Sequence, residues 1–407
     1  LCIHARKIRN SILYITRQAF LEDGHISPPE SDKILKSESP EIYFAISAAS
    51  SQRIGQIVGD SWKSYFELRK MWYDGELEKR PSLPGYSKSA TTFSVGRNGF
   101  RISDGRLHIS GGNKIGYSPI QVTCCENQPF NSKASQTVVR DVRIVPLGTS
   151  FVIELVYDRE EDDEIELDKT RVASLDPGVN NLLAIITNQP GISPVLVSGR
   201  SLKALNAQFN RDKAALAKMG KARHIGSKVV KRKNAIDDYF HKTSRWLIDW
   251  CIENRIGTLV IGKNIGWKDG INIGRRNNQT FTSLPHAQLI DMITYKAGAK
   301  GIDVITREES YTSKASALDL DPVPDFDKAC KVKHAFSGRR IKRGLYRTST
   351  GRLINADING ALNILRKEIG DGWVSSIADK GRVDRPVRIK HIDSWLGVGH
   401  RAVETTV

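Results

Sequence analysis

Residues 172–186 read Val-Ala-Ser-Leu-Asp-Pro-Gly-Val-Asn-Asn-Leu-Leu-Ala-Ile-Ile. Two short apolar runs flank the turn at Asp176-Pro-Gly, and this pattern predicts two strands joined by a tight connection. Further along the chain, residues 259–261 and 304–305 are short apolar runs, and a helical pattern begins between them at Pro285. Strands that alternate with helices are typical of an α/β layer architecture. The second half of the chain is therefore expected to be an α/β domain.

Acidic residues stand at the ends of these apolar segments. They are Asp176, Glu308, Glu309 and Asp357. Asp is common before Pro-Gly turns, and a carboxylate near a helix start complements the helix dipole, so each residue alone has an ordinary structural explanation. Together, carboxylates from two strand ends and one helix start form a ligand set for hard cations such as Mg²⁺. Since a pair of such ions can hydrolyse a phosphodiester, the set predicts a two-metal site.

The chain is strongly basic. Its 407 residues include 62 Lys and Arg against 45 Asp and Glu, which gives a formal net charge of +17. This excess favours a polyanionic partner such as nucleic acid. Two stretches concentrate the charge, a basic helical pattern over residues 202–254 and a segment over 315–354, and an ordinary solvated surface is the alternative for both. The candidate nucleic-acid-binding residues are Lys228, Lys231, Arg232, Lys233, Arg339, Arg340, Lys342, Arg343 and Arg347.

The first half of the chain changes its pattern at a Pro-rich linker. Residues 1–75 show apolar positions at helical spacing, such as Ile54 and Val58, and predict a helical part. The stretch 80–86 contains two prolines and a glycine and marks a boundary. From Phe93 the period becomes two, and short runs separated by Gly, Asn and Asp predict a small antiparallel barrel or sandwich.

Cysteine usage and hydropathy indicate the cellular compartment in which the protein is expected. The five cysteines form no C-x-x-C pair, so we expect neither a closed disulfide framework nor a zinc ribbon. This usage is typical of a reducing compartment. No apolar run reaches the ~18–20 residues that span a bilayer, and we expect no signal peptide. The expected location is the prokaryotic cytoplasm, in association with the nucleoid, or the nucleus of a eukaryotic host, with no membrane partner.

Four segments in a fixed order carry a resemblance to a known family. They are Leu175-Asp-Pro-Gly-Val-Asn-Asn181, Leu259-Val-Ile-Gly-Lys-Asn264, Glu309-Ser-Tyr-Thr-Ser-Lys314 and Asn355-Ala-Asp-Ile-Asn-Gly-Ala361. The chain resembles transposon-encoded TnpB proteins, which are RNA-guided DNA endonucleases related to type V CRISPR effectors. The stretch 80–86 is similar to the family's Arg-Pro-x-x-Pro-x-Tyr segment, so the resemblance covers nearly the whole chain.

The resemblance implies a multidomain α+β fold. The expected parts are a helical recognition part (1–80), a wedge β-barrel with an acidic linker (81–168), a RuvC-type, RNase H-like α/β nuclease domain (169–370) and a C-terminal tail (371–407). The nuclease domain would include the basic helical segment 202–254 and a basic insert, 315–354.

One departure from the family concerns the catalytic acid. TnpB proteins usually carry a catalytic Glu at the end of the middle strand, where this chain has Gly262 and Lys263. In relatives with the same Ile-Gly-Lys-Asn pattern, the acid comes from the next strand, just before Tyr-Thr-Ser. Glu309 or Glu308 would fill that role here. Successive side chains of a strand point to opposite faces, so only one of the two can face the metal ions. Glu309 is favoured because it lies beside the Tyr-Thr-Ser-Lys segment that carries the resemblance, although a β-bulge could exchange the two residues.

The second departure concerns zinc. Most relatives carry paired C-x-x-C motifs between Tyr-Thr-Ser and Asn-Ala-Asp, but here the interval 315–354 contains only Cys330. A structural zinc site cannot be assembled from this interval. The chain is therefore expected to belong to a subgroup with a displaced catalytic Glu and no zinc finger.

The resemblance implies an Mg²⁺-dependent, RNA-guided DNA endonuclease. Asp176, Glu309 and Asp357 would hold two metal ions for hydrolysis of target DNA next to a short motif, with guide RNA and double-stranded DNA as partners. A nuclease-dead, RNA-guided DNA-binding repressor is the alternative, because Gly262 replaces the usual Glu. A transposase that acts without RNA is a third interpretation. The sequence does not indicate the oligomeric state.

Overall fold

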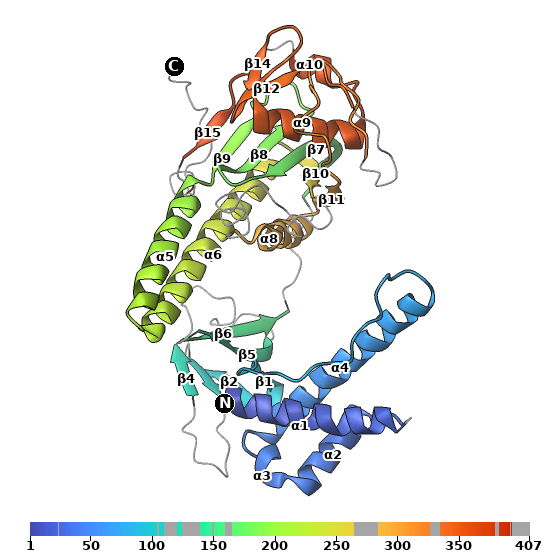
Figure 1. Cartoon of the computed structure of the whole chain (residues 1–407), viewed down its shortest axis with the longest axis vertical. Coiled ribbons are helices and arrows are strands. Elements are labelled where there is room, and N and C mark those ends of the chain that lie inside the picture. The colour runs from blue at the N-terminus through green and yellow to red at the C-terminus, as the bar shows by residue number, and fades with distance from the viewer. Residues whose placement is uncertain are drawn as a thin grey trace. The chain divides into compact units, whose positions relative to one another are not determined.

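The chain folds as two compact units, Leu1–Glu160 and Glu161–Val407 (Figure 1). This computed structural model describes residues 1–22, 24–103, 106–109, 120–123, 139–148, 150–158, 165–263, 284–325, 334–378, 382–390 and 392. The division between the units falls in the acidic stretch expected as a linker, of which residues 159–164 lie outside the described ones. A multidomain α+β architecture is thus confirmed.

The first unit begins with an all-helical part. Its helices are α1 (Cys2–Leu21), α2 (Pro28–Glu38), α3 (Pro40–Tyr43) and α4 (Ala48–Tyr73). A capping box at Ser27 starts α2. Ile54, Val58 and Trp62 of α4 are at most 5% exposed, as their helical spacing predicts. The Trp62 indole donates a hydrogen bond to Thr16 Oγ1 at 2.9 Å, so this ring belongs to the core between α1 and α4.

The rest of the first unit is antiparallel β-structure. Its strands are β1 (Phe93–Gly96), β2 (Phe100–Ser103), β3 (Arg106–Ile109), β4 (Ile120–Thr123), β5 (Val139–Leu147) and β6 (Ser150–Tyr157). They pair as two three-stranded sheets, β1–β5–β6 and β2–β3–β4. Phe93, Val95, Leu107 and Val142 are buried in the same core as α1 and α4. The described pairings are therefore two sheets in which every neighbouring pair is antiparallel.

The second unit is built around a six-stranded mixed sheet with the order β11-β10-β7-β8-β9-β15. The strands are β7 (Asp168–Pro177), β8 (Asn181–Thr187), β9 (Val195–Ser198), β10 (Ile256–Gly262), β11 (Asp303–Arg307) and β15 (Val387–Ile389). β7, β8 and β9 run antiparallel, whereas β10 is parallel to both β7 and β11, and β15 is parallel to β9. Residues 371–407 were expected as a tail, but they supply this edge strand and the short helix α10 (Val374–Ala378).

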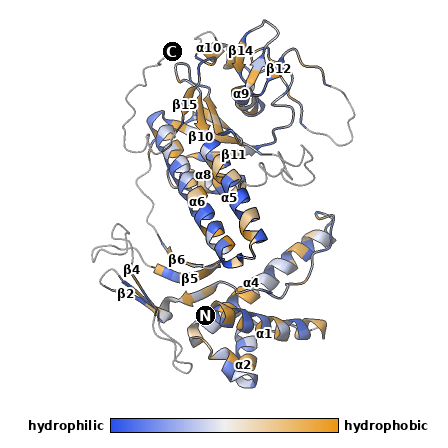
Figure 2. Cartoon of the chain, turned by 60° about the vertical axis from the view of Figure 1, so that its left-hand side comes forward, coloured by the Kyte–Doolittle hydropathy of each residue, from blue (hydrophilic) through white to orange (hydrophobic). Residues whose placement is uncertain are grey.

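Helices cover both faces of this sheet, with α6 and α8 on one side and α9 on the other (Figure 1). The helix bounds are α5 (Arg200–Lys218), α6 (Ala222–Glu253), α8 (His286–Gly298) and α9 (Ala356–Ile369). Alternation along β7 sends Ala173 and Leu175 to the α6–α8 side and Val172 to the α9 side. Ser174 Oγ donates to the Ala361 carbonyl at 2.6 Å, so α9 lies close on the sheet. The strands between these layers are strongly hydrophobic (Figure 2).

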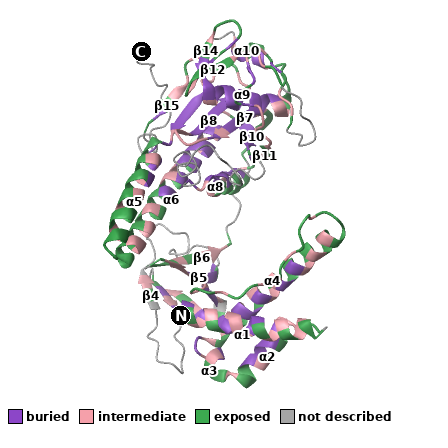
Figure 3. Ribbon diagram, in the orientation of Figure 1, coloured by how far each residue is buried: buried purple, intermediate pink, exposed green. Residues whose placement is uncertain are grey.

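The basic helical segment is two helices rather than one continuous run. Gly220 has a φ of 66°, a left-handed conformation that glycine adopts without strain, and it separates α5 from α6. The predicted apolar face of α6 is buried, with Ile236, Phe240, Leu247 and Cys251 at most 2% exposed. Much of α5 and the first part of α6 are exposed (Figure 3). Among the described residues, no helix has the length and apolar character needed to cross a bilayer.

A small antiparallel sheet lies within the insert 315–354. Its strands are β12 (Arg339–Lys342), β13 (Leu345–Arg347) and β14 (Leu353–Asn355). The chain passes from β14 directly into α9, whose Asn355 cap accepts hydrogen bonds from the amides of Asp357 and Ile358 at 3.0 and 3.3 Å. The insert is thus attached to the start of the helix that carries one of the candidate acids.

Candidate functional site

The α9 side of the sheet brings three of the four candidate acids toward one another. Asp176 follows Ser174 in the alternation that faces α9, and Asp357 lies in the first turn of that helix. Glu309 comes from the loop after β11. Because β7, β10 and β11 are parallel, their carboxyl ends share one edge of the sheet. This edge is where the three carboxylates lie.

Two glycines leave the space that these carboxylates use. A Cβ atom on Gly360 would lie 2.5 Å from Oδ2 of Asp176, and one on Gly262 would lie 2.9 Å from Oε2 of Glu309. Both distances are shorter than real Cβ contacts, so neither position accepts a side chain without movement. The Glu309 carboxylate therefore lies against residue 262, where the family pattern has its acid.

The electrostatics of Asp176 show that the three acids interact. Burial raises the pKa of the Asp176 carboxyl well above its ordinary value, and the negative charges of Glu309 and Asp357 raise it further. The positive charge of Arg340 acts in the opposite direction. Like charges shift a pKa in this way only when they are close, so the three side chains form one electrostatic cluster.

Asp357 has two polar partners that the sequence did not reveal. Asn181 Nδ2, at the start of β8, donates a hydrogen bond to Asp357 Oδ2 at 2.7 Å. Arg340 Nη2, on β12, lies 3.4 Å from Asp357 Oδ1. Asn181 ends the motif 175–181, which was a usable signal, whereas Arg340 was recognised only as one of many basic residues.

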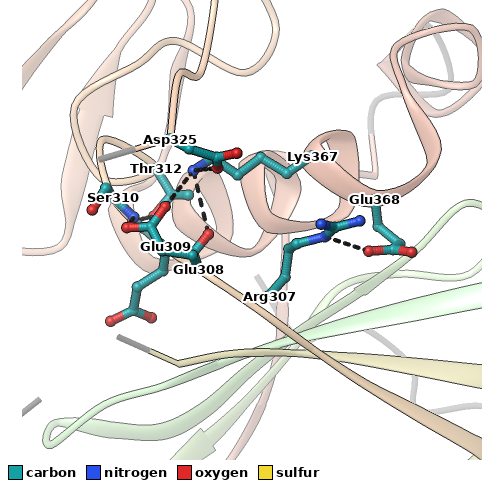
Figure 4. A network of polar contacts seen from close by, with 8 residues as sticks. All are labelled: Arg307, Glu308, Glu309, Ser310, Thr312, Asp325, Lys367 and Glu368. Atoms are coloured by element: carbon teal, nitrogen blue, oxygen red, sulfur yellow. Dashed lines mark hydrogen bonds and ion pairs between the residues drawn. The ribbon is translucent and has the colours of Figure 1, made fainter. Parts of the chain in front are cut away.

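Glu308 makes contacts of its own, and Figure 4 shows its carboxylate pointing in a different direction from that of Glu309. Its Oε2 pairs with Lys367 Nζ at 2.9 Å, and its Oε1 accepts a hydrogen bond from the Ser310 amide at 2.9 Å. Burial alone would raise the pKa of the Glu308 carboxyl, but the hydrogen bonds to Ser310 and Lys367 outweigh burial and lower it. Glu309, rather than Glu308, is thus the residue beside Asp176.

The acid cluster fits magnesium in its chemistry. It offers carboxylate oxygens, the ligands that Mg²⁺ prefers, and the raised pKa of Asp176 reflects negative charge that a cation would neutralise. As the side chains stand, no group of three His, Cys, Asp or Glu residues within the described ranges is arranged to hold an ion. Arg340 instead lies against Asp357. Asp176, Glu309 and Asp357 are the residues that would hold the ion.

The candidate nucleic-acid-binding residues of α6 are partly engaged within the protein. Three of them have polar partners in the α5–α6 region: Lys228 with Asp212 at 2.6 Å, Lys233 with Asp237 at 2.5 Å, and Arg232 with Asn206 Oδ1 at 2.5 Å. Lys231 is exposed. The surface ion pairs are weak enough for phosphate groups to replace them.

The candidates in the insert are all exposed. They are Arg339, Arg340, Lys342, Arg343 and Arg347. Arg339 and Arg347 lie directly opposite each other in the β12–β13 pair. Like charges at opposed positions destabilise a strand pair, so an anion bound there would relieve the repulsion. This small sheet therefore concentrates positive charge beside the acid cluster, which it reaches through Arg340.

The prediction that the insert holds no zinc concerns residues that the structure describes only in part, and it stays a prediction. The cysteines among the described residues, Cys2 and Cys251, are both free and buried. Cys330, the cysteine of the insert, lies outside the described residues.

Comparisons with known proteins agree with the family resemblance. The family model described as a probable transposase, OrfB_IS605, matches residues 154–268, and the Cas12f1-like TNB domain model matches residues 286–364. The TnpB-like protein ORF457 of Acidianus two-tailed virus is 21% identical over 400 residues, which cover 89% of this chain and 81% of the relative. A chain in a cryo-EM structure of a Cas12f1–sgRNA–target DNA complex has a similar fold, with a TM-score of 0.54, 16% identity, and coverage of 88% of this chain and 80% of that chain. Two family models, the curated relative and the fold agree in direction: the chain is similar to TnpB-like and Cas12f1-like proteins.

Proposed function

We propose that the protein is an RNA-guided, Mg²⁺-dependent DNA endonuclease. The observation that carries the proposal is the gathering of Asp176, Glu309 and Asp357 at one edge of the sheet, where burial and then the two neighbouring carboxylates raise the pKa of Asp176. Active sites characteristically bring like charges together in a buried position, whereas a fold selected for stability alone avoids this. The relationship to TnpB-type proteins supports the same reaction.

The chain's own residues would bind and orient the reacting groups. Asp176, Glu309 and Asp357 would hold the metal ions, while Asn181 fixes one oxygen of Asp357 by donating to it at 2.7 Å. Two bound Mg²⁺ ions would supply an activated water and stabilisation of the leaving oxygen of a phosphodiester. A Cβ atom on residue 360 would lie 2.5 Å from Asp176 Oδ2, so the glycine at this position leaves the room that the Asp176 carboxylate occupies.

The other parts of the chain would bind nucleic acid by charge and shape. We assign the mixed sheet and its helices to a RuvC-type, RNase H-like nuclease domain, and residues 93–157 to a wedge β-barrel. The exposed cations of α6 and of the β12–β13 pair would contact phosphates, which bind protein without conveying sequence. Base pairing with a guide RNA would then select the double-stranded DNA target. Such a role belongs in the prokaryotic cytoplasm or in a eukaryotic nucleus.

The proposal that an RNA guides cleavage is tested by identifying the RNA that the protein binds. The protein is purified from its native locus, and the RNA that accompanies it is sequenced. We expect a long structured RNA, DNA binding that weakens steeply with salt, and cleavage that follows a change of the guide sequence. RNA-free protein that binds and cuts one fixed DNA sequence would contradict guided cleavage.

A second function, that of a nuclease-dead RNA-guided DNA-binding repressor, is favoured by one specific contact. Arg340 Nη2 lies 3.4 Å from Asp357 Oδ1, where a metal ion would need that oxygen. If this contact persists with nucleic acid bound, the acids cannot all serve a metal. Target binding without any cleavage in Mg²⁺ would support the repressor, and cleavage would exclude it.

A further inference from the structure

The backbone is held on both sides of Glu309 by hydrogen bonds that involve its neighbour Glu308 (Figure 4). Lys367 Nζ donates to the Glu308 carbonyl at 3.3 Å and pairs with Glu308 Oε2 at 2.9 Å. Glu308 Oε1 in turn accepts from the Ser310 amide at 2.9 Å. The first of these groups belongs to the peptide that precedes Glu309 and the last to the peptide that follows it. Lys367 and Glu308 thus fix the orientation of the Glu309 backbone.

The ammonium group of Lys367 is buried and needs the carboxylate of Glu308 as a partner. The Lys367 side chain is 5% exposed, and its second partner, Asp325 Oδ1 at 3.0 Å, belongs to a side chain that is 79% exposed. A buried ammonium group is costly unless it is paired, so Lys367 depends on the carboxylate of Glu308 and on the exposed carboxylate of Asp325.

Helix α9 also fixes the loop after β11 on the C-terminal side of Glu309. Glu309's carbonyl accepts from the Thr312 amide at 3.2 Å and from its hydroxyl at 2.7 Å. Asn363 Nδ2 of α9 donates to the Thr312 carbonyl at 2.8 Å. Between them Tyr311 has a φ of 62°, which a bulky residue adopts only when its surroundings enforce it. The conformation that presents Glu309 is therefore imposed by α9 rather than preferred locally.

We propose that Lys367 is a positioning residue for Glu309: by binding the carbonyl and carboxylate of Glu308, it holds the Glu309 carboxylate in the cluster with Asp176 and Asp357. α9 then has two roles, because it carries Asp357 in its first turn and orients Glu309 through Lys367 in its last turn. Glu308 accordingly has a structural role as the acceptor for Lys367. This inference rests on the proposed function, since it concerns the metal-binding capacity of the cluster.

The test compares RNA-loaded complexes of the full chain. Mn²⁺ binding is followed by electron paramagnetic resonance, and binding to the Asp176→Ala complex, which shares the RNA, is subtracted. Lys367→Met, which keeps the length of the side chain but removes its charge and donors, should weaken the remaining Mn²⁺ binding by about 10–100-fold, as is typical when a residue that orients a ligand is lost. Cleavage should fall most at low Mg²⁺ and recover at high Mg²⁺, while target affinity stays unchanged.

Two further variants show whether the effect is specific to Glu309. Lys169→Met is the matched control, because Lys169 pairs with Asp303 at 2.9 Å at the start of β11, and it should behave as wild type. In a Glu309→Gln background, Lys367→Met should add no further loss of Mn²⁺ affinity, because residues that act through one another are not additive.

The outcomes separate this inference from the proposed function. The positioning role would be overturned if Lys367→Met bound Mn²⁺ as tightly as the wild type does. It would also be overturned if Lys367→Met caused its full loss of Mn²⁺ affinity in the Glu309→Gln background. Neither result would contradict cleavage of DNA by the wild type. Should Lys367→Met fail to fold, Glu308→Ala removes the carboxylate that binds Lys367 and the Ser310 amide, while Lys367 keeps the carbonyl of residue 308 and Asp325, and this variant must also weaken Mn²⁺ binding. A wild type that binds no more Mn²⁺ than Asp176→Ala and cuts nothing would overturn the proposed function, and the positioning role with it.

Discussion

Gly262 and Glu309 share one space at the carboxyl edge of the sheet: a Cβ atom on Gly262 would lie 2.9 Å from Oε2 of Glu309. Gly262 pairs with Arg307 at the end of the parallel β10–β11 register, and Glu309 follows two residues later in the loop. Glu309 thus reaches the space beside residue 262 from the loop that follows β11, the strand next to β10 in the sheet. The Glu309 carboxylate can occupy this space because residue 262 has no side chain.

Gly262→Ala should therefore destabilise the protein and impair cleavage. The new methyl group would lie 2.5 Å from Ile364 Cδ1 as well as 2.9 Å from Glu309, and overpacking of this kind costs about 1–3 kcal/mol. Denaturant unfolding measures the loss, and single-turnover cleavage measures the displacement of Glu309. Gly298→Ala, at the end of α8, is the control, because a Cβ there would contact nothing within 4 Å. Equal behaviour of the two variants would contradict the shared space.

Asp319 ties together three parts of the insert. Its Oδ2 accepts from the Ser316 hydroxyl at 2.5 Å, from the Ser337 hydroxyl at 3.2 Å and from the Ser349 amide at 2.7 Å. We expect Asp319→Asn to lower the free energy of unfolding by about 1–3 kcal/mol at neutral pH, because donors that faced a carboxylate lose an acceptor. Asp303→Asn, an exposed acid paired with Lys169, should cost much less.

The stabilisation by Asp319 should depend on pH. Burial alone would raise the pKa of this carboxyl, but hydrogen bonds from Ser316, Ser349 and Ser337 outweigh burial and lower it. A pKa that is lower in the folded state means that the stabilisation is complete above the unfolded value of about 4 and is lost as pH falls through the folded value. The difference in unfolding free energy between wild type and Asp319→Asn should be constant above about pH 5 and shrink below pH ~4. A difference that grows on acidification would contradict this assignment.

Metal analysis of the purified protein should find no stoichiometric zinc. The interval 315–354 contains one cysteine, which cannot complete a four-ligand site. A zinc-selective chelator should leave the melting temperature unchanged, and so should Cys330→Ser. One equivalent of tightly held zinc would show that the insert is built differently.

The order of strands and helices around the sheet was predictable, but several details were not. Short apolar runs at 172–175 and 259–261 identified β7 and β10, because buried parallel strands are continuously apolar. β12 escaped notice because three of its four residues are cations, and β15 because it has only three residues and pairs with the distant strand β9. The break at Gly220 was missed because the helical pattern continues on both sides of it.

The approach of the candidate acids to one another was also predictable, whereas the contacts that fix them were not. Strand ends and a helix start placed Asp176, Glu309 and Asp357 in one region from the sequence alone. The interactions of Arg340 with Asp357 and of Lys367 with Glu308 join residues that are distant in the chain, and only the folded register brings them together. No local pattern distinguishes these two cations from their many basic neighbours.

The most direct test of the central claim is single-turnover cleavage of a matched DNA target by the RNA-loaded protein in Mg²⁺, with Glu309→Gln compared with Glu308→Gln. We predict that the wild type cuts, that Glu309→Gln, like Asp176→Ala and Asp357→Ala, abolishes cleavage without loss of target binding, and that Glu308→Gln costs little. Gln at 308 keeps one acceptor oxygen in its side chain, and Lys367 keeps the carbonyl of residue 308 and Asp325, whereas Gln at 309 lacks the charge that metal ions require. Cleavage that survives Glu309→Gln but not Glu308→Gln, or a wild type that binds its target and never cuts it, would contradict the account.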